Sequence, residues 1–406
     1  MSLPIGQIAQ LRLGGNYKNG ADITNRPLIK MGNIARISID LSRIDYIPTS
    51  ENVDLTHQLR FGDVLFNTRN TLELVGKVSI WRNELRLAFY NSNILRLRFK
   101  PEICGDSQYF GYALNAVENI KAIRNLATGT TTVAAIYTRD LLKLEVLVPS
   151  KAEQRSIAEA LYDVDQHISA LERMIAKKQA IKRGMMQELL SGRTRLPGFN
   201  GEWIEGVWGE FAEYISSGAT PSRSRDAFWG GSIPWVTSTE LKRGLVTRVP
   251  QKITEAGRRA ANLQIWPAGT FVMAITGLEA AGTRGSCGVL GHAAATNQSC
   301  MVVVPSARLD TGYLFQYYLY YGEELALKYT QGTKQQSYTA GLVRELPIRL
   351  PEDVSEQGAI AGALSDAEEE VRALQVRLTK AHAIKQGMMQ QLLTGRVRLP
   401  VEARHD

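Results

Sequence analysis

The stretch AIKRGMMQELLSGRTRLP at 180–197 recurs as AIKQGMMQQLLTGRVRLP at 383–400, an offset of 203 residues. Extended back to position 153, the two copies are identical at 24 of 45 positions without a gap. Self-similarity of this kind is the mark of an internal repeat. We therefore interpret the 406-residue chain as two halves, each a domain followed by a repeated segment.

Both repeated segments have the hydrophobic pattern of a long helix. Apolar residues alternate at intervals of four and three, which is typical of helices that pack along one seam. Gly192 and Gly395 stand where a helix C-terminus is expected, and Pro197 and Pro400 follow. A helix over 153–191 is about 58 Å long. We predict that the two helices pair with each other, antiparallel; packing of each helix on its own domain is the alternative. The predicted seam consists of Ile157, Leu161, Val164, Ile168, Leu171, Ile175, Ile360, Leu364, Ala367, Val371, Leu374 and Leu378.

The regions before the two helices differ more, yet they share strand-like segments and glycine-marked turns in the same order. The matched segments are 27–33 with 233–239, 62–66 with 269–273, 91–99 with 297–305 and 141–149 with 342–351, and helices are predicted at 108–126 and 312–329. The predicted fold class is α+β: two mixed α/β domains separated by two long antiparallel coiled-coil helices and related by a pseudo-twofold internal repeat. The predicted boundaries are 1–150, 151–195, 196–350 and 351–406.

Composition narrows the function classes. The net charge is +8, and all of the excess lies in residues 1–200, with 27 basic against 19 acidic residues. A basic chain suggests nucleic acid or an acidic surface as its partner. We expect no membrane span and no signal peptide. The three cysteines (Cys104, Cys287, Cys300) are few and far apart, which fits a reducing cytosol.

No pattern of catalytic residues stands out. Gly76-Lys77 lacks the other residues of a P-loop, and Gly282–Gly288 lacks the strand–GxGxxG–helix setting of a phosphate cradle. We expect Gly282–Gly288 to be a flexible loop. The five histidines and three cysteines show no metal-ligand spacing. We therefore predict no catalytic residue and no metal site.

This plan resembles the specificity (S, or HsdS) subunits of type I restriction–modification systems. The resemblance rests on Glu153-Gln154 and Glu356-Gln357 before each helix, on the two helix ends quoted above, and on the link RLPGFNGEW at 195–203. Members often have a Trp-containing lead-in, equivalent to Glu202-Trp203, before the first domain as well. This sequence has no such residues ahead of its first domain, so that domain is expected to be edged differently.

The resemblance implies a DNA-binding, non-catalytic subunit of a cytoplasmic restriction system. Each domain would be a target recognition domain that reads one half of a split, asymmetric DNA site. The paired helices would set the spacing of the halves and dock two modification (methyltransferase) subunits, and two restriction (translocase–nuclease) subunits would complete the enzyme. S-adenosylmethionine would be bound by the methyltransferase subunit, with no cofactor in this chain. A D/N-P-P-Y/F methyltransferase loop is absent, since the sequence has no Pro-Pro pair.

Polar loops that recur in both halves are the candidate DNA contacts, because bases and phosphates are read by Arg, Lys, Asn, Gln, Ser and Thr. The alternative for each residue is a solvated surface turn. The candidates are Lys18, Asn19, Lys30, Asn33, Thr68, Arg69, Asn70, Thr130, Thr131, Thr132, Arg223, Arg225, Thr237, Ser238, Lys242, Arg284, Lys334, Gln335, Gln336 and Ser337. The alternating strand Arg96–Lys100 is either an electrostatic face or an ordinary half-buried strand.

Two other functions stay open at this point. The chain would be a two-domain coiled-coil adaptor or DNA-binding protein without a restriction partner, or an enzyme fused with its reader. The missing methyltransferase and P-loop motifs disfavour the fused enzyme. Lysines near the helix ends (Lys177, Lys178, Lys182, Lys380, Lys385) either dock a partner, follow DNA phosphates or form a solvated face.

Overall fold

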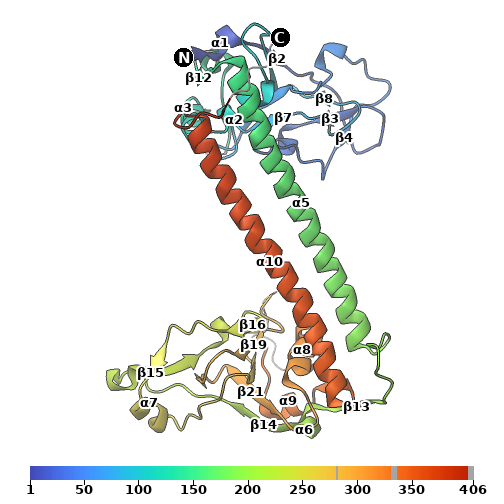
Figure 1. The fold of residues 1–406 in the computed structure, drawn as a ribbon, viewed down its shortest axis with the longest axis vertical. Coiled ribbons are helices and arrows are strands. Elements are labelled where there is room, and N and C mark those ends of the chain that lie inside the picture. The colour runs from blue at the N-terminus through green and yellow to red at the C-terminus, as the bar shows by residue number, and fades with distance from the viewer. Residues whose placement is uncertain (131, 280–281, 331–335, 401–406) are drawn as a thin grey trace. The chain divides into compact units, whose positions relative to one another are not determined.

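The computed structural model describes residues 1–130, 132–279, 282–330 and 336–400, and it divides into two compact units. The first unit is Met1–Glu172 with Val376–Asp406, and the second is Arg173–Gln375. Two long helices, α5 (Lys151–Leu190) and α10 (Val354–Leu392), pass through both units (Figure 1). Each unit therefore contains one mixed α/β region, the start of one long helix and the end of the other.

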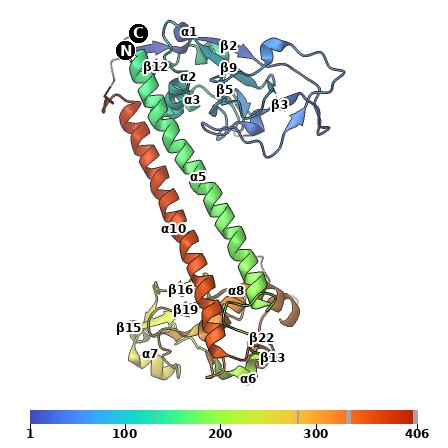
Figure 2. The same ribbon diagram turned by 45° about the vertical axis from the view of Figure 1, so that its right-hand side comes forward.

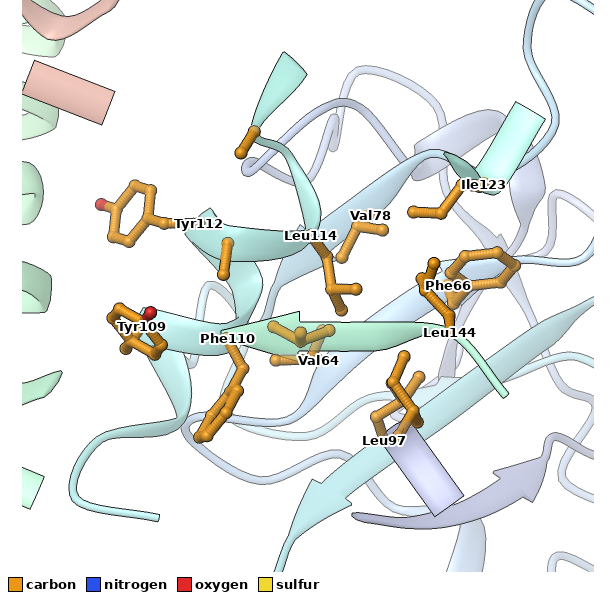
Figure 3. Close-up of a cluster of buried hydrophobic side chains, with 14 of the residues drawn as sticks. Val64, Phe66, Val78, Leu97, Tyr109, Phe110, Tyr112, Leu114, Ile123 and Leu144 are labelled. Carbon is orange, nitrogen blue, oxygen red and sulfur yellow. The ribbon is translucent and has the colours of Figure 1, made fainter. Parts of the chain in front are cut away.

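The first unit is built around the antiparallel four-stranded sheet β2-β9-β5-β7 (Figure 2). Helix α2 (Ser107–Leu114) covers one face of the sheet and fills the core with Tyr109, Phe110 and Leu114. Figure 3 shows these side chains against Val64 and Leu97. The four strands are β2 (Ala9–Leu13), β5 (Val64–Asn67), β7 (Val78–Ile80) and β9 (Ile94–Phe99).

Smaller sheets and helices complete the first unit. The sheets are β1 (Ser2–Pro4) with β12 (Glu145–Leu147); β4 (Asp45–Tyr46), β3 (Pro27–Ile29) and β8 (Phe89–Tyr90); and β10 (Thr128–Gly129), β11 (Ala134–Ala135) and β6 (Arg69–Asn70). The helices are α1 (Ile5–Ile8), α3 (Val117–Asn125), α4 (Thr138–Leu141), and the 3₁₀ turns η1 (Met31–Asn33) and η2 (Leu55–His57).

The second unit repeats this plan with a five-stranded sheet, β14-β21-β18-β19-β16. Its strands are β14 (Ala212–Ser217), β16 (Gly244–Val246), β18 (Phe271–Ala274), β19 (Cys287–Leu290) and β21 (Cys300–Pro305). The smaller sheets are β17 (Lys252–Ile253), β15 (Trp229–Val236) and β20 (Ala295–Thr296), and β13 (Trp203–Val207) with β22 (Pro347–Pro351). The helices are α6 (Trp208–Phe211), η3 (Asp226–Phe228), η4 (Ser238–Glu240), α7 (Glu255–Ala260), α8 (Thr311–Tyr329) and α9 (Ala340–Arg344).

The prediction of a single helix over 108–126 in the first unit was wrong. The chain breaks at Asn115, between α2 and α3, whereas α8 in the second unit is continuous. The Asn115 side-chain amide donates to the carbonyls of Gly111 (2.9 Å) and Val78 (3.0 Å). Asparagine side chains compete with the helical backbone for hydrogen bonds, so this residue ends the helix and ties it to β7.

The helices pair antiparallel within each unit, as predicted. In the first unit Asp165 Oδ1 lies 2.5 Å from Lys385 Nζ, and Glu153 contacts Arg398; positions rise along α5 as they fall along α10. In the second unit Lys178 contacts Glu370 and Lys182 contacts Glu368, so the helices are antiparallel there as well. All predicted seam residues are buried except Val164, Ala367 and Leu378, which are partly buried.

The two predicted helix ends are also confirmed. Gly192 (φ 70°) and Gly395 (φ 71°) both adopt the left-handed conformation, which L side chains rarely take and glycine takes freely. No helix within the described ranges is long and apolar enough to cross a membrane.

Candidate nucleic-acid interface

In the first unit, three of the predicted polar loops meet at the turn Asn91–Asn93, which precedes β9. The Asn91 amide donates to Ile29 O (3.1 Å), next to Lys30, and Ser92 donates to Gly15 O at the start of the Lys18 loop. Thr68 donates to Asn93 O through both its backbone amide (3.0 Å) and its hydroxyl (2.8 Å). One short turn therefore holds together loops that are about 50 residues apart in sequence.

Beside this turn, Lys30 contacts Asn19, the sequence neighbour of Lys18. Lys30 Nζ contacts Asn19 Oδ1 (3.1 Å) and forms an ion pair with Asp45 (2.7 Å). Both Lys18 and Asn19 are exposed, whereas Asn33 is buried. The Asn33 side chain caps η1: it accepts from the Lys30 amide and donates to two backbone carbonyls. Its hydrogen-bonding groups are thus used inside the domain.

A small sheet brings the other two predicted loops together. Strand β11 pairs with both β6 and β10, so Arg69 and Asn70 lie across from Ala135 and Ala134, and Thr130 and Thr132 belong to the connection between β10 and β11. Arg69, Thr130 and Thr132 are exposed, and Asn70 is partly buried. Thr68 is buried because it binds the 91–93 turn. Thr131 lies outside the described residues.

The second unit has the same arrangement around the turn Asn297–Ser299. The Asn297 amide donates to Val236 O (2.9 Å), directly before Thr237, and Ile275 donates to Ser299 O (2.9 Å). Gln298 contacts Thr220 in the loop after β14. Gln336 then joins the group, because its carbonyl accepts from the Leu278 amide. Lys334 and Gln335 lie outside the described residues.

Equivalent capping turns follow the first long loop in both units. The Thr237 amide and hydroxyl donate to the Glu240 carboxylate, just as the Lys30 amide donates to Asn33 Oδ1. Thr237 and Ser238 are partly buried, and Lys242 is exposed. Ser337 is partly buried beside Gln336.

The predicted arginines of the second unit are held by aromatic and backbone groups. The Arg223 guanidinium stacks over Trp229 (4.1 Å) and contacts Gln251, and Arg225 lies over Phe228 (5.5 Å). Such cation–π contacts orient a guanidinium and leave its edge able to donate. Arg284 donates to Glu279 O, and within the part of the chain that the structure describes its buried Nε has no hydrogen-bond partner.

The two central turns were not predicted from the sequence. Asn91 and Asn297 both form Asx turns, in which the side-chain oxygen accepts the amide of the residue two positions later, Asn93 and Ser299. The signal was present as the N-x-N and N-x-S triplets before the matched strands. Three of the helix lysines proved to be cross-helix partners: Lys178 binds Glu370, Lys182 binds Glu368, and Lys385 binds Asp165.

A repeated glutamine attaches each α/β region to its helix. Gln154 accepts from the Gly105 amide (2.8 Å) and donates to Ile103 O and Pro149 O. Gln357 accepts from Asp310 and donates to Arg308 O and Pro351 O in the same way. Both glutamines are completely buried, so each α/β region is fixed to the start of its long helix.

A cluster of three or more His, Cys, Asp or Glu side chains suited to a metal is absent from the described parts of the chain. The predicted contact residues that are exposed in these loops carry hydroxyl, amide and cationic groups. These groups donate to and accept from base edges and phosphates.

A family model for the type I restriction modification DNA specificity domain matches the chain twice, at residues 4–183 and 200–380. The putative MjaX specificity subunit of Methanocaldococcus jannaschii is 27% identical over 183 residues, which is 45% of this chain and 43% of the relative. The MjaVIII specificity subunit of the same organism is 21% identical and covers 76% of this chain and 74% of the relative. The match spans less than half the length of the first of these relatives.

Two solved structures have a similar fold. The S subunit of a type I restriction–modification system from M. genitalium aligns with a TM-score of 0.65 at 14% identity, and covers 97% of this chain and 95% of that one. A chain from a structural study of complex assembly and conformational transition in the type I R-M system aligns with a TM-score of 0.55 at 15% identity, over 98% of both chains. At these identities the likeness concerns the fold.

Proposed function

The chain belongs to the type I restriction modification DNA specificity family, and on that premise we propose that it is the DNA-recognition subunit of a type I restriction–modification complex. The observation that carries the proposal is the double family match on two units with the same internal plan. One unit would read each half of a bipartite DNA site. The proposed division remains 1–150 and 196–350 for the two readers, with 151–195 and 351–406 as spacers.

Differences between the loops of the two units support an asymmetric target. Lys18, Asn19 and Arg69 project from the first unit, whereas the second presents Arg223, Arg225 and further residues. Arginine and lysine pair with guanine, and asparagine and glutamine pair with adenine, so two different loop sets select two different half-sites. The half-sites would lie about one helical turn apart or somewhat more, as for other two-headed readers.

The repeated helices support docking of two modification subunits. Ile181 and Ile384 occupy the same repeat position and are 45% and 54% exposed. A single exposed apolar side chain is ordinary, but the same one at equivalent positions of both helices indicates a surface used twice. In the first unit Ile384 borders a hollow of about 430 Å³ with Val164 and Ala381. The methyltransferase subunits would supply S-adenosylmethionine and catalysis, and two restriction subunits would complete the enzyme.

The test is to co-express the chain with its cognate modification subunit and to sequence modified bases in the host DNA. We expect the two to co-purify and N6-methyladenine to occur at one split, non-palindromic motif. Co-purification without a motif would point to a complex whose reader is inactive. Absence of both would contradict the proposal and favour the two-domain adaptor.

A further inference from the structure

A pocket rich in arginine lies on the first unit, on residues outside the predicted contact loops. It has a volume of about 400 Å³ and is lined by Arg12, Arg60, Arg96 and Arg98 together with Gln10, Thr56 and three other residues. No carboxylate is among these lining residues. Four cationic side chains around one concave surface form an anion-binding environment.

Strand register places three of these arginines on one face of the main sheet. Arg12 on β2 lies across from Arg96 on β9, and Gln10 lies across from Arg98. Leu97, between the two β9 arginines, points to the opposite face and into the core (Figure 3). The alternation Arg-Leu-Arg therefore presents charge on one side and packing on the other.

Arg96 is the fixed base of the pocket. It is only 5% exposed, and its Nη1 donates to Thr56 O (2.8 Å) and Gln58 O (3.3 Å). Its buried Nε has no hydrogen-bond partner among the described residues. Arg12 Nη1 donates to the Thr56 hydroxyl (2.5 Å), so Thr56 holds two guanidinium groups side by side.

Most of this charge is not neutralised within the unit. Arg98 is paired with Asp63 through two contacts of 2.7 and 3.1 Å. Arg12, Arg60 and Arg96 form no ion pair with any described residue. Burial lowers the pKa of Arg96 from its ordinary value, and the nearby Tyr90 and Asp63, which raise it, offset this only in part. A buried cation without a counterion is costly, and an anion in the pocket would relieve that cost.

We propose that this pocket binds a backbone phosphate of the DNA held by the first unit, an inference that rests on the proposed function. A phosphodiester offers several oxygens to guanidinium donors, which bind such groups in pairs. The pocket also adjoins the Lys18 loop. Tyr17, beside Lys18, hydrogen-bonds His57 (2.7 Å), which follows Thr56 in η2.

The site is particular to the first unit. In the second unit the strands equivalent to β9 and β2 are β21 and β14. The positions of Arg96, Arg98 and Arg12 are occupied there by Val302, Val304 and Ser216. Val302 is fully buried and belongs to a hydrophobic cluster. The phosphate contact would thus anchor only one half of the complex, where the excess charge of residues 1–200 is concentrated.

The experiment measures binding of the full chain, with its modification subunit, to a mixed-sequence duplex across a series of KCl concentrations. The variant R12Q/R60Q removes the two exposed guanidinium groups and leaves buried Arg96 in place. R86Q is the control, an exposed arginine of the same unit outside the pocket. Each lost phosphate contact lowers the salt slope by about one. Because the pocket holds one phosphate, we expect the double variant to lose about one unit of slope and about tenfold in affinity, with the control unchanged.

Competition by inorganic phosphate and modified-base sequencing separate the outcomes. An unchanged salt slope in R12Q/R60Q, with the wild type binding DNA normally, overturns the pocket proposal and leaves the proposed function intact. If inorganic phosphate binds the pocket but does not compete with DNA binding, the pocket is a small-anion site, and the pocket proposal is also overturned. A wild-type complex that binds no DNA contradicts both. Loss of affinity with the methylated motif unaltered supports a phosphate contact.

Discussion

Arg195 and Glu356, 161 residues apart, form a two-contact ion pair in the second unit: Nε lies 2.6 Å from Oε1 and Nη2 lies 2.5 Å from Oε2. The pair joins the end of one repeated segment to the start of the other. Its repeat equivalent is Arg398 with Glu153 in the first unit, where the guanidinium is 80% exposed and the contact is 3.5 Å. The same two residue types thus give a buried pair in one unit and a solvated pair in the other.

We expect R195A to destabilise the second unit by about 2–3 kcal/mol, because it leaves the buried Glu356 carboxylate without its counterion. R398A is the matched control and should leave stability unchanged, since exposed pairs contribute little. Urea unfolding of the full chain measures both. Equal losses in the two variants would show that the pairs do not differ in burial as described.

Asp165 is a second test, in the first unit. Its carboxylate accepts from Tyr112 (2.6 Å) and Arg82 (3.4 Å) and pairs with Lys385, which links the α/β region to both helices. D165N should cost about 2 kcal/mol, because two partly buried cations lose their partner. E368Q alters the repeat equivalent, whose side chain is 56% exposed, and should have little effect in the same unfolding assay. A larger effect of E368Q would contradict this assignment.

Several features of the long helices could be predicted from the sequence alone. Seam residues such as Ile157 and Leu374 were predicted because heptad spacing is a local property of the chain, and Gly192 because helix ends have a local signature. The Arg195–Glu356 pair could not be predicted, since it depends on the register of two helices distant in sequence. The break at Asn115 was missed because it depends on a contact with Val78 in another strand.

The candidate interface, too, could be predicted only in part. Polar loops were recognisable from their recurrence in both halves, but their exposure was not. Asn33 and Asn70 were both predicted as contacts from polar loops, yet the hydrogen-bonding groups of Asn33 are used in a capping turn. The arginine pocket was equally hidden, because Arg12 and Arg96 meet only through strand pairing.

Docking of the modification subunit should depend on the repeated isoleucines. We expect I181D/I384D to abolish co-purification of that subunit, because a buried charge in an apolar contact is costly. The chain should stay folded, since both positions are exposed. Q187D/Q390D, another exposed pair at equivalent repeat positions, is the control for added charge. Unchanged co-purification of the isoleucine variant would place the docking surface elsewhere.

The three thiols should be unreactive in the native protein. Burial raises the pKa of Cys104 to about 11 and of Cys287 to about 12, and it also raises that of Cys300. Thiolate is therefore scarce at pH 8, and a disulfide reagent should label the native chain slowly and all three thiols in denaturant. Because these pKa values are raised, their contribution to stability is present below about pH 9 and declines as the pH rises toward 12. Rapid labelling of the native chain at pH 8 would contradict the burial of these groups.

An exchange of one reader tests whether each unit recognises its own half of the DNA site. Residues 1–148 are replaced by the corresponding region of another family member, and modified bases are sequenced in cells that carry the modification subunit. We expect one half of the methylated motif to change while the other half stays the same, because each unit reads its own half-site. A motif that is unaltered, or one that changes in both halves, would contradict it.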